Sequence, residues 1–409
     1  MTIHKTWAIY VITKHGVKIA RKLREQLDDV DIYVTHKFGN QLQMDRVYLL
    51  NLPMGETVSA TFNQYNAHIY IMSIGIVVRM IAPLLRNKKT DPAIICVDDK
   101  AQFTIPVLSG HVGRGNEYAN KISRILENTP VITTASDVGQ TFTVDILGRE
   151  LGWTLDDTDQ NVTRACAAVV NQENILFVQE TGENNFWPEE KELPIGVEYA
   201  TNLDGISIDD FSVFLIATDR DIKKLFPDIY EHAVIYRPRS LVLGMGCDRD
   251  TPLEIVERGI RNVLKENHLD FRCIKGFATI DIKADEAAFL MLKEKYAWDL
   301  TTYRADELDA VKDIPTPSVT VKKYVGTHGV AEPSAMLSAG TNELIVPKQV
   351  YKEEGCKKNV TIAIARIPFP VRIPNKETQK VLTEVRKGEN IEDVTFDSLI
   401  FEAKESVKS

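Results

Sequence analysis

The sequence predicts an α/β protein of several domains, with largely parallel sheets flanked by helices and a separate α/β domain at the C-terminal end. Short β-branched runs alternate with amphipathic segments along the chain, which is typical of parallel sheets connected by helices. The length of 409 residues is enough for two or three ordinary domains. The five cysteines are scattered singly without a CxxC pair, so neither a disulfide framework nor a structural zinc site is expected.

The predicted N-terminal domain covers residues 1–153. Strands are expected where short apolar or β-branched runs occur, at 7–12, 31–34, 69–72, 93–97, 103–108 and 131–132. Helices are expected where apolar residues recur at helical spacing, at 17–27, at 75–85, from a glycine-rich turn to about 126, and at 138–151. Strands and helices therefore alternate through this domain.

Residues 154–238 are predicted to form a middle domain, because the composition becomes more polar and fewer strong motifs occur there. A C-terminal domain is expected at 239–370. Its first strand begins at Leu241, and Thr251-Pro252-Leu253-Glu254 carries the N-cap, the first-turn proline and the capping-box Glu of a helix. Further elements are expected as strands at 277–282 and 360–365 and as helices from about 285 and near 332. The charged segment 371–409 is expected to be a peripheral tail.

The charge balance excludes some classes of partner. With 49 Lys+Arg against 58 Asp+Glu the net charge is −9, which argues against a constitutive nucleic-acid binder. Nowhere do about 18 apolar residues run uninterrupted, so no membrane partner is expected, and the unpaired cysteines favour a reducing cytoplasm. Residues 75–125 carry eight basic and four acidic side chains, so a polyanionic small molecule could bind in this segment.

Two polar turns are the strongest candidates for a functional site. The glycine turn 109–116 lies between a strand and a helix, and it offers Ser109, His111 and Asn116 together with a backbone that a ligand can approach. The polar turn 133–137 follows the next strand. Neighbouring parallel strands end at the same sheet edge, where ligands bind, so both turns are expected at one site. The alternative is a tight turn whose histidine only satisfies backbone groups.

Other sequence patterns give weaker evidence of a functional site. Gly244-Met245-Gly246 resembles the start of a dinucleotide fingerprint, but Arg249 stands at the third glycine position, so a nucleotide or sugar-phosphate enzyme is the weaker alternative. Lys283 lies near a strand end, where a solvated position beside a helix cap explains it better than catalysis does. Glu332 lies near a helix start, where the helix dipole favours a carboxylate in any case. No metal-ligand spacing appears in the sequence, so no metal site is expected.

Two sets of motifs occur together in order. The first set is Gly75-Ile76-Val77-Val78-Arg79-Met80-Ile81-Ala82-Pro83-Leu84-Leu85, Asp91-Pro92-Ala93, Val97-Asp98, Leu108-Ser109-Gly110-His111, Thr133-Thr134-Ala135-Ser136-Asp137 and Gly152-Trp153. The second set is Gly244-Met245-Gly246-Cys247, Ala278-Thr279-Ile280-Asp281-Ile282-Lys283, Asp285-Glu286, Val325-Gly326-Thr327, Val330-Ala331-Glu332 and Val346-Pro347-Lys348. Together they cover most of residues 46–366, and they resemble the signature of the cobalt-precorrin-5A hydrolase family, CbiG.

The chain departs from that signature in two turns. Arg114 stands where the family usually has a second glycine, which adds a cation suited to carboxylates. Asp248, Arg249 and Asp250 follow Cys247 where the family usually has two arginines and a glycine, which weakens the case for anion binding by this loop.

The resemblance implies a step of anaerobic cobalamin biosynthesis. The family opens the ring-A lactone of cobalt-precorrin-5A and expels the methylated meso carbon as acetaldehyde, which gives cobalt-precorrin-5B. Cobalt arrives inside the corrinoid substrate, so no cofactor bound by the protein is implied. Neighbouring enzymes of the pathway are the expected protein partners, and the oligomeric state stays open. The alternative is a non-catalytic protein that binds and shuttles corrinoids, because the C-terminal part also resembles a stand-alone protein of the aerobic pathway.

The chemistry of the residues suggests their roles. His111 is the expected general base, and Asp137 either orients it or is itself the base. Ser109, Thr133 and Thr134 are expected to stabilise the oxyanion, and Arg79, Arg114 and Lys283 to bind substrate carboxylates. The remaining expected substrate contacts are Gly110, Gly113, Asn116, Ser136 and Glu332. The sequence leaves open whether the site lies in the N-terminal domain or is shared with the C-terminal domain.

Overall fold

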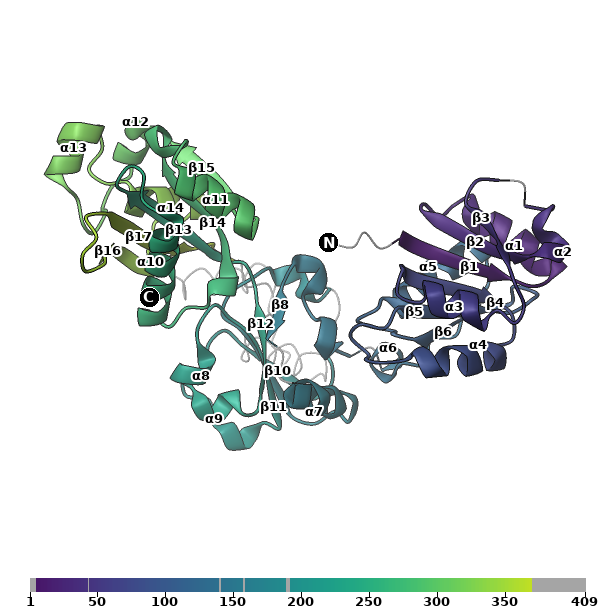
Figure 1. Ribbon diagram of the computed structural model, residues 1–409. Helices are drawn as coiled ribbons and strands as arrows, with labels where there is room; N and C mark the ends of the chain where they lie inside the picture. The colour runs from purple at the N-terminus through teal and green to yellow at the C-terminus, as the bar shows by residue number, and fades with distance from the viewer. Residues whose placement is uncertain (1–4, 43, 140, 157–158, 189–191, 370–409) are drawn as a thin grey trace, which may run out of the picture. The chain divides into compact units, whose positions relative to one another are not determined.

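The computed structural model describes residues 5–369 except 43, 140, 157–158 and 189–191 (Figure 1). The chain divides into two compact units, residues 1–146 and 147–409, called unit 1 and unit 2 below. Most strand pairs are parallel and helices flank the sheets, so the predicted α/β class is confirmed. The predicted domain boundaries stay a prediction, and the predicted tail at 371–409 lies outside the described residues.

Unit 1 contains a seven-stranded sheet in the order β3-β2-β1-β4-β5-β6-β7. Its strands are β1 (Lys5–Val11), β2 (Val30–Thr35), β3 (Val47–Leu50), β4 (Tyr65–Ile71), β5 (Ala93–Val97), β6 (Phe103–Leu108) and β7 (Thr129–Pro130). Its helical segments are α1 (Lys14–Arg24), α2 (His36–Gly39), α3 (Gly55–Thr61), α4 (Ile74–Ile81), η1 (Ala82–Leu84), α5 (Gly115–Leu126), α6 (Ala135–Val138) and η2 (Val144–Ile146). Strands β1 to β5 are parallel, whereas β6 is antiparallel to β5 and β7 is parallel to β6.

A short hairpin reverses the chain between β5 and β6. The Asp98 carboxylate accepts hydrogen bonds from the backbone N–H groups of Lys100, Gln102 and Phe103 at 2.8, 2.8 and 2.6 Å. One side chain therefore accepts the hydrogen bonds of three backbone N–H groups in the turn, a role that aspartate commonly has. Because of this reversal, the C-terminal ends of β6 and β7 lie at the sheet edge opposite to the C-terminal ends of β1 to β5.

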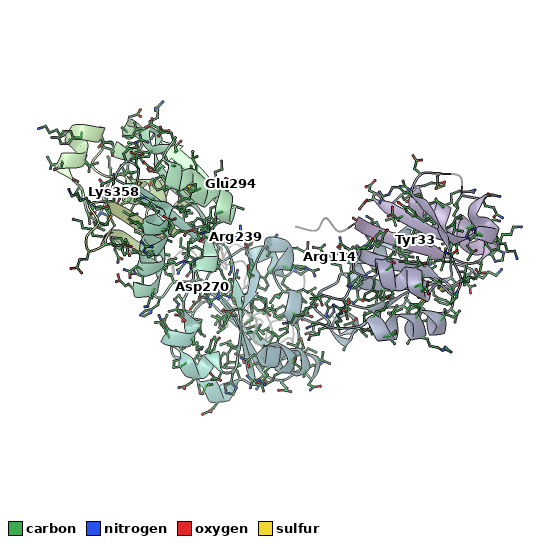
Figure 2. The ribbon with its side chains drawn as sticks, in the orientation of Figure 1. Tyr33, Arg114, Arg239, Asp270, Glu294 and Lys358 are labelled. Atoms are coloured by element: carbon green, nitrogen blue, oxygen red, sulfur yellow. The ribbon has the colours of Figure 1, made fainter. Side chains whose placement is uncertain are left out.

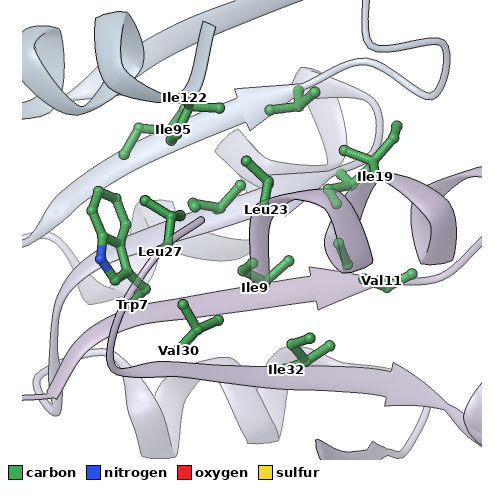
Figure 3. Packing of buried hydrophobic residues seen from close by; sticks show 14 of the residues in the cluster. Trp7, Ile9, Val11, Ile19, Leu23, Leu27, Val30, Ile32, Ile95 and Ile122 are labelled. Carbon is green, nitrogen blue, oxygen red and sulfur yellow. The ribbon is translucent and has the colours of Figure 1, made fainter. Parts of the chain in front are cut away.

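Helices cover both faces of this sheet. On one face α3 and α4 pack over a cluster that includes Tyr10. Tyr10 stacks on Tyr33, which is labelled in Figure 2, with ring centroids 5.1 Å apart. On the other face α1 and α5 pack over Trp7 and Ile9, with Leu23 and Ile122 supplied by the two helices (Figure 3). The apolar face predicted for the helix ending near 126 is thus buried against the sheet.

Unit 2 contains two five-stranded sheets, in the orders β10-β9-β11-β12-β8 and β15-β14-β13-β17-β16. The strands of the first are β8 (Thr154–Asp156), β9 (Ile175–Gln179), β10 (Val197–Ala200), β11 (Val213–Ala217) and β12 (Ala233–Arg237). The strands of the second are β13 (Leu241–Cys247), β14 (Ile274–Ile280), β15 (Asp299–Tyr303), β16 (Val346–Lys352) and β17 (Asn359–Arg366). The first and second are called the middle and C-terminal sheets below.

Helices of unit 2 flank these sheets. With the middle sheet are η3 (Arg149–Leu151), α7 (Asp159–Val170), η4 (Asn184–Phe186), η5 (Ile208–Asp210), α8 (Ile222–Leu225) and α9 (Pro227–Tyr230). With the C-terminal sheet are α10 (Leu253–Glu266), η6 (Phe271–Cys273), η7 (Asp281–Lys283), α11 (Ala287–Tyr296), α12 (Ala305–Asp309), α13 (Val319–Val325) and α14 (Ala331–Ala339). Within the described parts of the chain, none of the helices has the length and apolar character needed to cross a lipid bilayer.

Two ion pairs join the two sheets of unit 2. Asp219 follows β11, is completely buried, and accepts two hydrogen bonds from the Arg366 guanidinium, both at 2.6 Å. Asp156 of β8 is paired in the same bidentate way with the exposed Arg272 of η6, at 2.9 and 2.7 Å. The Asp219–Arg366 pair holds its geometry because leaving the buried carboxylate unpaired would be costly.

The continuous helix expected at 138–151 is wrong. Helix α6 ends at Val138, and only the short turns η2 and η3 follow. Phe142 and Val144 are both buried, and their spacing of two residues cannot place both on one face of an α-helix. Burial of these two side chains therefore holds this segment in an irregular path, which frees Asp145 to point elsewhere.

The packing of α14 on β13 depends on a glycine. A Cβ atom added to Gly244 would lie 1.7 Å from the backbone carbonyl oxygen of Ala331, at the start of α14. Ala331 and Ala335 complete a contact made of small residues. The helix therefore approaches the strand more closely than any side chain at position 244 would allow.

We expect Gly244→Ala to reduce the free energy of unfolding of the chain by at least about 3 kcal/mol, because backbone atoms of α14 would have to move. Urea denaturation followed by circular dichroism measures this change. Gly55→Ala is the matched control, since an added Cβ there meets nothing within 4 Å. A Gly244→Ala variant as stable as the control would contradict the close approach of α14.

Candidate active site

The two predicted polar turns lie at the same edge of the unit 1 sheet. The glycine turn follows β6, and α6 follows β7, its parallel neighbour. The turn is held by backbone hydrogen bonds from Gly115 to Ser109 and from Asn116 to Gly110, at 2.9 and 3.0 Å. A Cβ on Gly113 would lie 2.5 Å from the Cβ of Ser109, so the turn closes on itself only with glycine there.

His111 is held between carboxylates. Its Nε2 lies 2.9 Å from Oδ2 of Asp137 and 3.2 Å from Oγ of Ser136, and its Nδ1 lies 3.4 Å from Oδ1 of Asp145. Asp145, and after it Asp137, raise the pKa of His111 above its ordinary value of 6.5, although burial of the ring acts in the opposite direction. The site therefore favours the imidazolium form of this histidine.

Asp137 connects the histidine to a cavity. Its Oδ2 also accepts a hydrogen bond of 2.7 Å from Nδ2 of the buried Asn116, which in turn donates to Oγ1 of Thr134 at 2.8 Å. Asp137 lines a cavity of about 330 Å³ together with Asn120, Ile132 and Val138. Among the described residues, none donates a hydrogen bond to its second oxygen, Oδ1. That oxygen is open to a water molecule or a ligand.

The remaining predicted residues of the two turns have other positions. Ser109 Oγ donates to the backbone carbonyl of Asp91 at 2.9 Å, so this hydroxyl anchors the turn to the start of β5. Thr133 is exposed, and Arg114 contacts Glu117 at 3.1 Å. Gly110 lies against Asn116, whose Oδ1 would be 2.8 Å from an added Cβ. The predicted cluster of His111, Asn116, Thr134, Ser136 and Asp137 is brought together.

Three predicted substrate contacts are not part of this cluster. The guanidinium of Arg79 donates to the carbonyl of Gly75 at 3.1 Å, near the C-terminal end of β4 and therefore at the opposite sheet edge. In unit 2, Lys283 is paired with the buried Glu286 at 2.9 Å. Glu332 is buried, and its two oxygens accept hydrogen bonds from the backbone N–H groups of Lys348 and Thr316, both at 3.0 Å. Its carboxylate therefore braces two loops, in place of the expected substrate contact.

Asp145 is the residue that the sequence interpretation missed. It lies within the helix predicted at 138–151, and that helix gave it no particular role. The spacing of the apolar residues Phe142 and Val144, both buried, was the signal against a helix there. Asn120 and Ile132 of the cavity lining were also not selected. Among the described residues, no group of three His, Cys, Asp or Glu side chains is arranged as metal ligands. The expected absence of a cofactor stays a prediction.

These features define a class of protein: a multi-domain α/β protein with a histidine–carboxylate site at a sheet edge. Comparison with known families gives three consecutive matches. Residues 56–137 match "Cobalamin synthesis G N-terminal", 142–238 match "Cobalamin biosynthesis central region" and 241–365 match "Cobalamin synthesis G C-terminus".

Curated relatives agree with these matches. A cobalt-precorrin-5A hydrolase of Priestia megaterium is 40% identical over 365 residues, which cover 89% of this chain and 95% of the relative. A cobalt-precorrin-5A hydrolase of Salmonella typhimurium is 28% identical, with coverage of 81% and 91%. Protein CobE of Sinorhizobium sp is 32% identical over 112 residues, 27% of this chain and 73% of CobE. The chain belongs to the CbiG family, as its motifs predicted.

We expect Asp145→Asn to lower the pKa of His111, because the largest source of the upward shift is removed. The pKa is raised in the folded state, so protonation stabilises unit 1 below the unfolded value of 6.5, and this stabilisation is lost as the pH rises through the raised pKa. Histidine NMR titration measures the midpoint directly.

Asp45→Asn is the control for that titration, because Asp45 is an exposed aspartate of the same unit. An unchanged midpoint in Asp145→Asn would show that Asp145 does not act on His111.

Proposed function

We propose that this chain hydrolyses cobalt-precorrin-5A, opening the ring-A lactone and releasing the methylated meso carbon as acetaldehyde to give cobalt-precorrin-5B. The observation that carries the proposal is the pairing of His111, whose pKa is raised, with the carboxylate of Asp137, which lines a cavity. The names of the relatives support the substrate. The reaction needs both a proton acceptor for water and a proton donor for the leaving oxygen, and the pair supplies both.

The first step is hydrolysis of the lactone. Asp137 Oδ1 accepts a proton from water while the water oxygen bonds to the lactone carbonyl carbon. His111 Nε2 then gives its proton to the ring oxygen as the carbon–oxygen bond breaks, which yields a carboxylic acid and a hydroxyl group. In this assignment His111 is the acid and Asp137 the base, because carboxylates at both ring nitrogens favour the charged imidazole. From the sequence, His111 was the expected base, and Asp137 was either its orienting group or itself the base.

The second step breaks the carbon–carbon bond. Neutral His111 takes the proton of the new hydroxyl group, and the oxygen forms the carbonyl of acetaldehyde. The bonding electron pair passes into the conjugated macrocycle, which takes up the proton held by Asp137. Both residues thus return to their starting states, and the sum of the two steps consumes one water molecule. Cobalt enters as part of the substrate.

Asn116 orients the base. It donates one amide hydrogen to Asp137 Oδ2 and one to Thr134, so the carboxylate is held with its other oxygen towards solvent. Arg114 of the glycine turn is suited to the acetate and propionate groups of the macrocycle.

We expect His111→Ala and Asp137→Asn each to reduce acetaldehyde release by about 10²- to 10⁴-fold, the usual contribution of a general acid or base. Acetaldehyde is measured by its reduction with alcohol dehydrogenase and NADH. His36→Ala is the control, because His36 is exposed at the opposite sheet edge. If purified wild-type chain binds the substrate and releases no acetaldehyde, the chain is a corrinoid carrier and the hydrolase proposal fails.

The pH dependence tests the assignment of His111 as the acid. We expect the rate of lactone opening to fall as the pH rises through the raised pKa of His111, since the proton donor is then lost. In Asp145→Asn the same fall should begin at lower pH. Rates that instead rise through this pH range would make neutral His111 the base, as the sequence suggested.

A further inference from the structure

A second cavity lies in unit 2, where the middle sheet meets the C-terminal sheet. Its volume is about 390 Å³. The loop after β9 contributes Asn184 and Asn185, and the connection between β12 and β13 contributes Arg239, which is labelled in Figure 2. Lys275 of β14 and the segment 367–369 after β17 complete the lining. Four separate parts of the chain therefore converge on one cavity.

The walls of this cavity are fixed by hydrogen bonds. The indole Nε1 of Trp153 donates to Oε2 of Glu183 at 2.5 Å, and the amide of Gln179 donates to the carbonyl of Glu183 at 2.8 Å. On the other side the N–H of Ile367 donates to the carbonyl of Ser240 at 2.9 Å. A ligand would therefore meet a site that already has its shape, which reduces the entropy lost on binding.

The charges of this cavity differ from those around it. The nearby Arg272 and Arg366 are both paired with carboxylates. Arg239 and Lys275 are exposed, and neither side chain has an ion-pair or hydrogen-bond partner among the described residues. Glu183 is the acidic residue of the lining, so the lining carries a net charge of about +1.

The apolar part of the lining is formed by Ile367, Pro368 and Phe369. A cavity lined by two unpaired cations and an apolar segment suits a ligand with carboxylates on an apolar body. We infer that this cavity binds peripheral carboxylates of a corrinoid, with Arg239 and Lys275 as the recognising cations. This inference rests on the proposed function for the identity of the macrocycle, and it adds a corrinoid-binding site in unit 2.

Calorimetric titration of the full chain tests the inference. The probe is dicyanocobyrinic acid, a corrinoid with free carboxylates, and its comparison is dicyanocobinamide, in which amides replace them. The double variant Arg239→Gln/Lys275→Gln should weaken dicyanocobyrinic acid binding by at least about tenfold, as expected for lost charge-assisted hydrogen bonds. Binding of dicyanocobinamide should change by less than about twofold. The control is Lys293→Gln, which removes an exposed cation of α11 outside the cavity.

Three outcomes would overturn the inference: unchanged binding of dicyanocobyrinic acid by the double variant, an equal loss for both corrinoids, or complete displacement of dicyanocobyrinic acid by glutarate. The last result would make a free small dicarboxylate the ligand. The titration needs no turnover, so it is independent of the acetaldehyde assay. If the chain releases no acetaldehyde but the double variant loses dicyanocobyrinic acid binding, the proposed reaction is contradicted and the inference that the cavity binds a corrinoid still holds.

Discussion

The reversal of the chain at Asp98 determines where the candidate active site lies. Three backbone N–H groups donate to this carboxylate, and β6 consequently returns beside β5 in the opposite direction. Without this hairpin the glycine turn would follow a strand parallel to the first five, at the other edge of the sheet. His111 therefore depends for its position on an aspartate that has no part in the proposed chemistry.

The same reversal allows a few direct side-chain contacts to hold the residues of the candidate active site together. Because β6 and β7 are parallel neighbours, the segments that follow them bring His111 and Asp137 together, and the buried Asn116 at the start of α5 fixes the carboxylate. Asp145 then reaches the other ring nitrogen from η2. A histidine between two carboxylates is stabilised as a cation although it is largely removed from solvent, and this is the condition for acid catalysis above the ordinary pKa of imidazole.

Local patterns predicted much of this arrangement. The strands expected at 93–97 and 103–108 coincide with β5 and β6, because continuous apolar runs bounded by polar residues are a strong signal. The proximity of His111 and Asp137 followed from two turns after neighbouring strands. The direction of β6 was not predictable, since it depends on how one carboxylate folds a five-residue turn. Because β6 is reversed, Arg79 lies at the sheet edge opposite to the glycine turn. Asp145 was missed because buried Phe142 and Val144 override a weak helical pattern.

The ion pairs inside unit 2 have a consequence for modularity. Asp219 and Asp156 belong to the part of the chain that aligns with the family's central region. Arg272 belongs to the part that aligns with the C-terminal region, and Arg366 follows directly after that part. A gene that encoded only residues 239–369 would give a protein whose Arg366 lacks its buried acidic partner, whereas Arg272 would keep Asp270. Fusion of the two parts into one polypeptide therefore creates a dependence at Arg366, and separation of them in evolution would favour a compensating substitution at position 366.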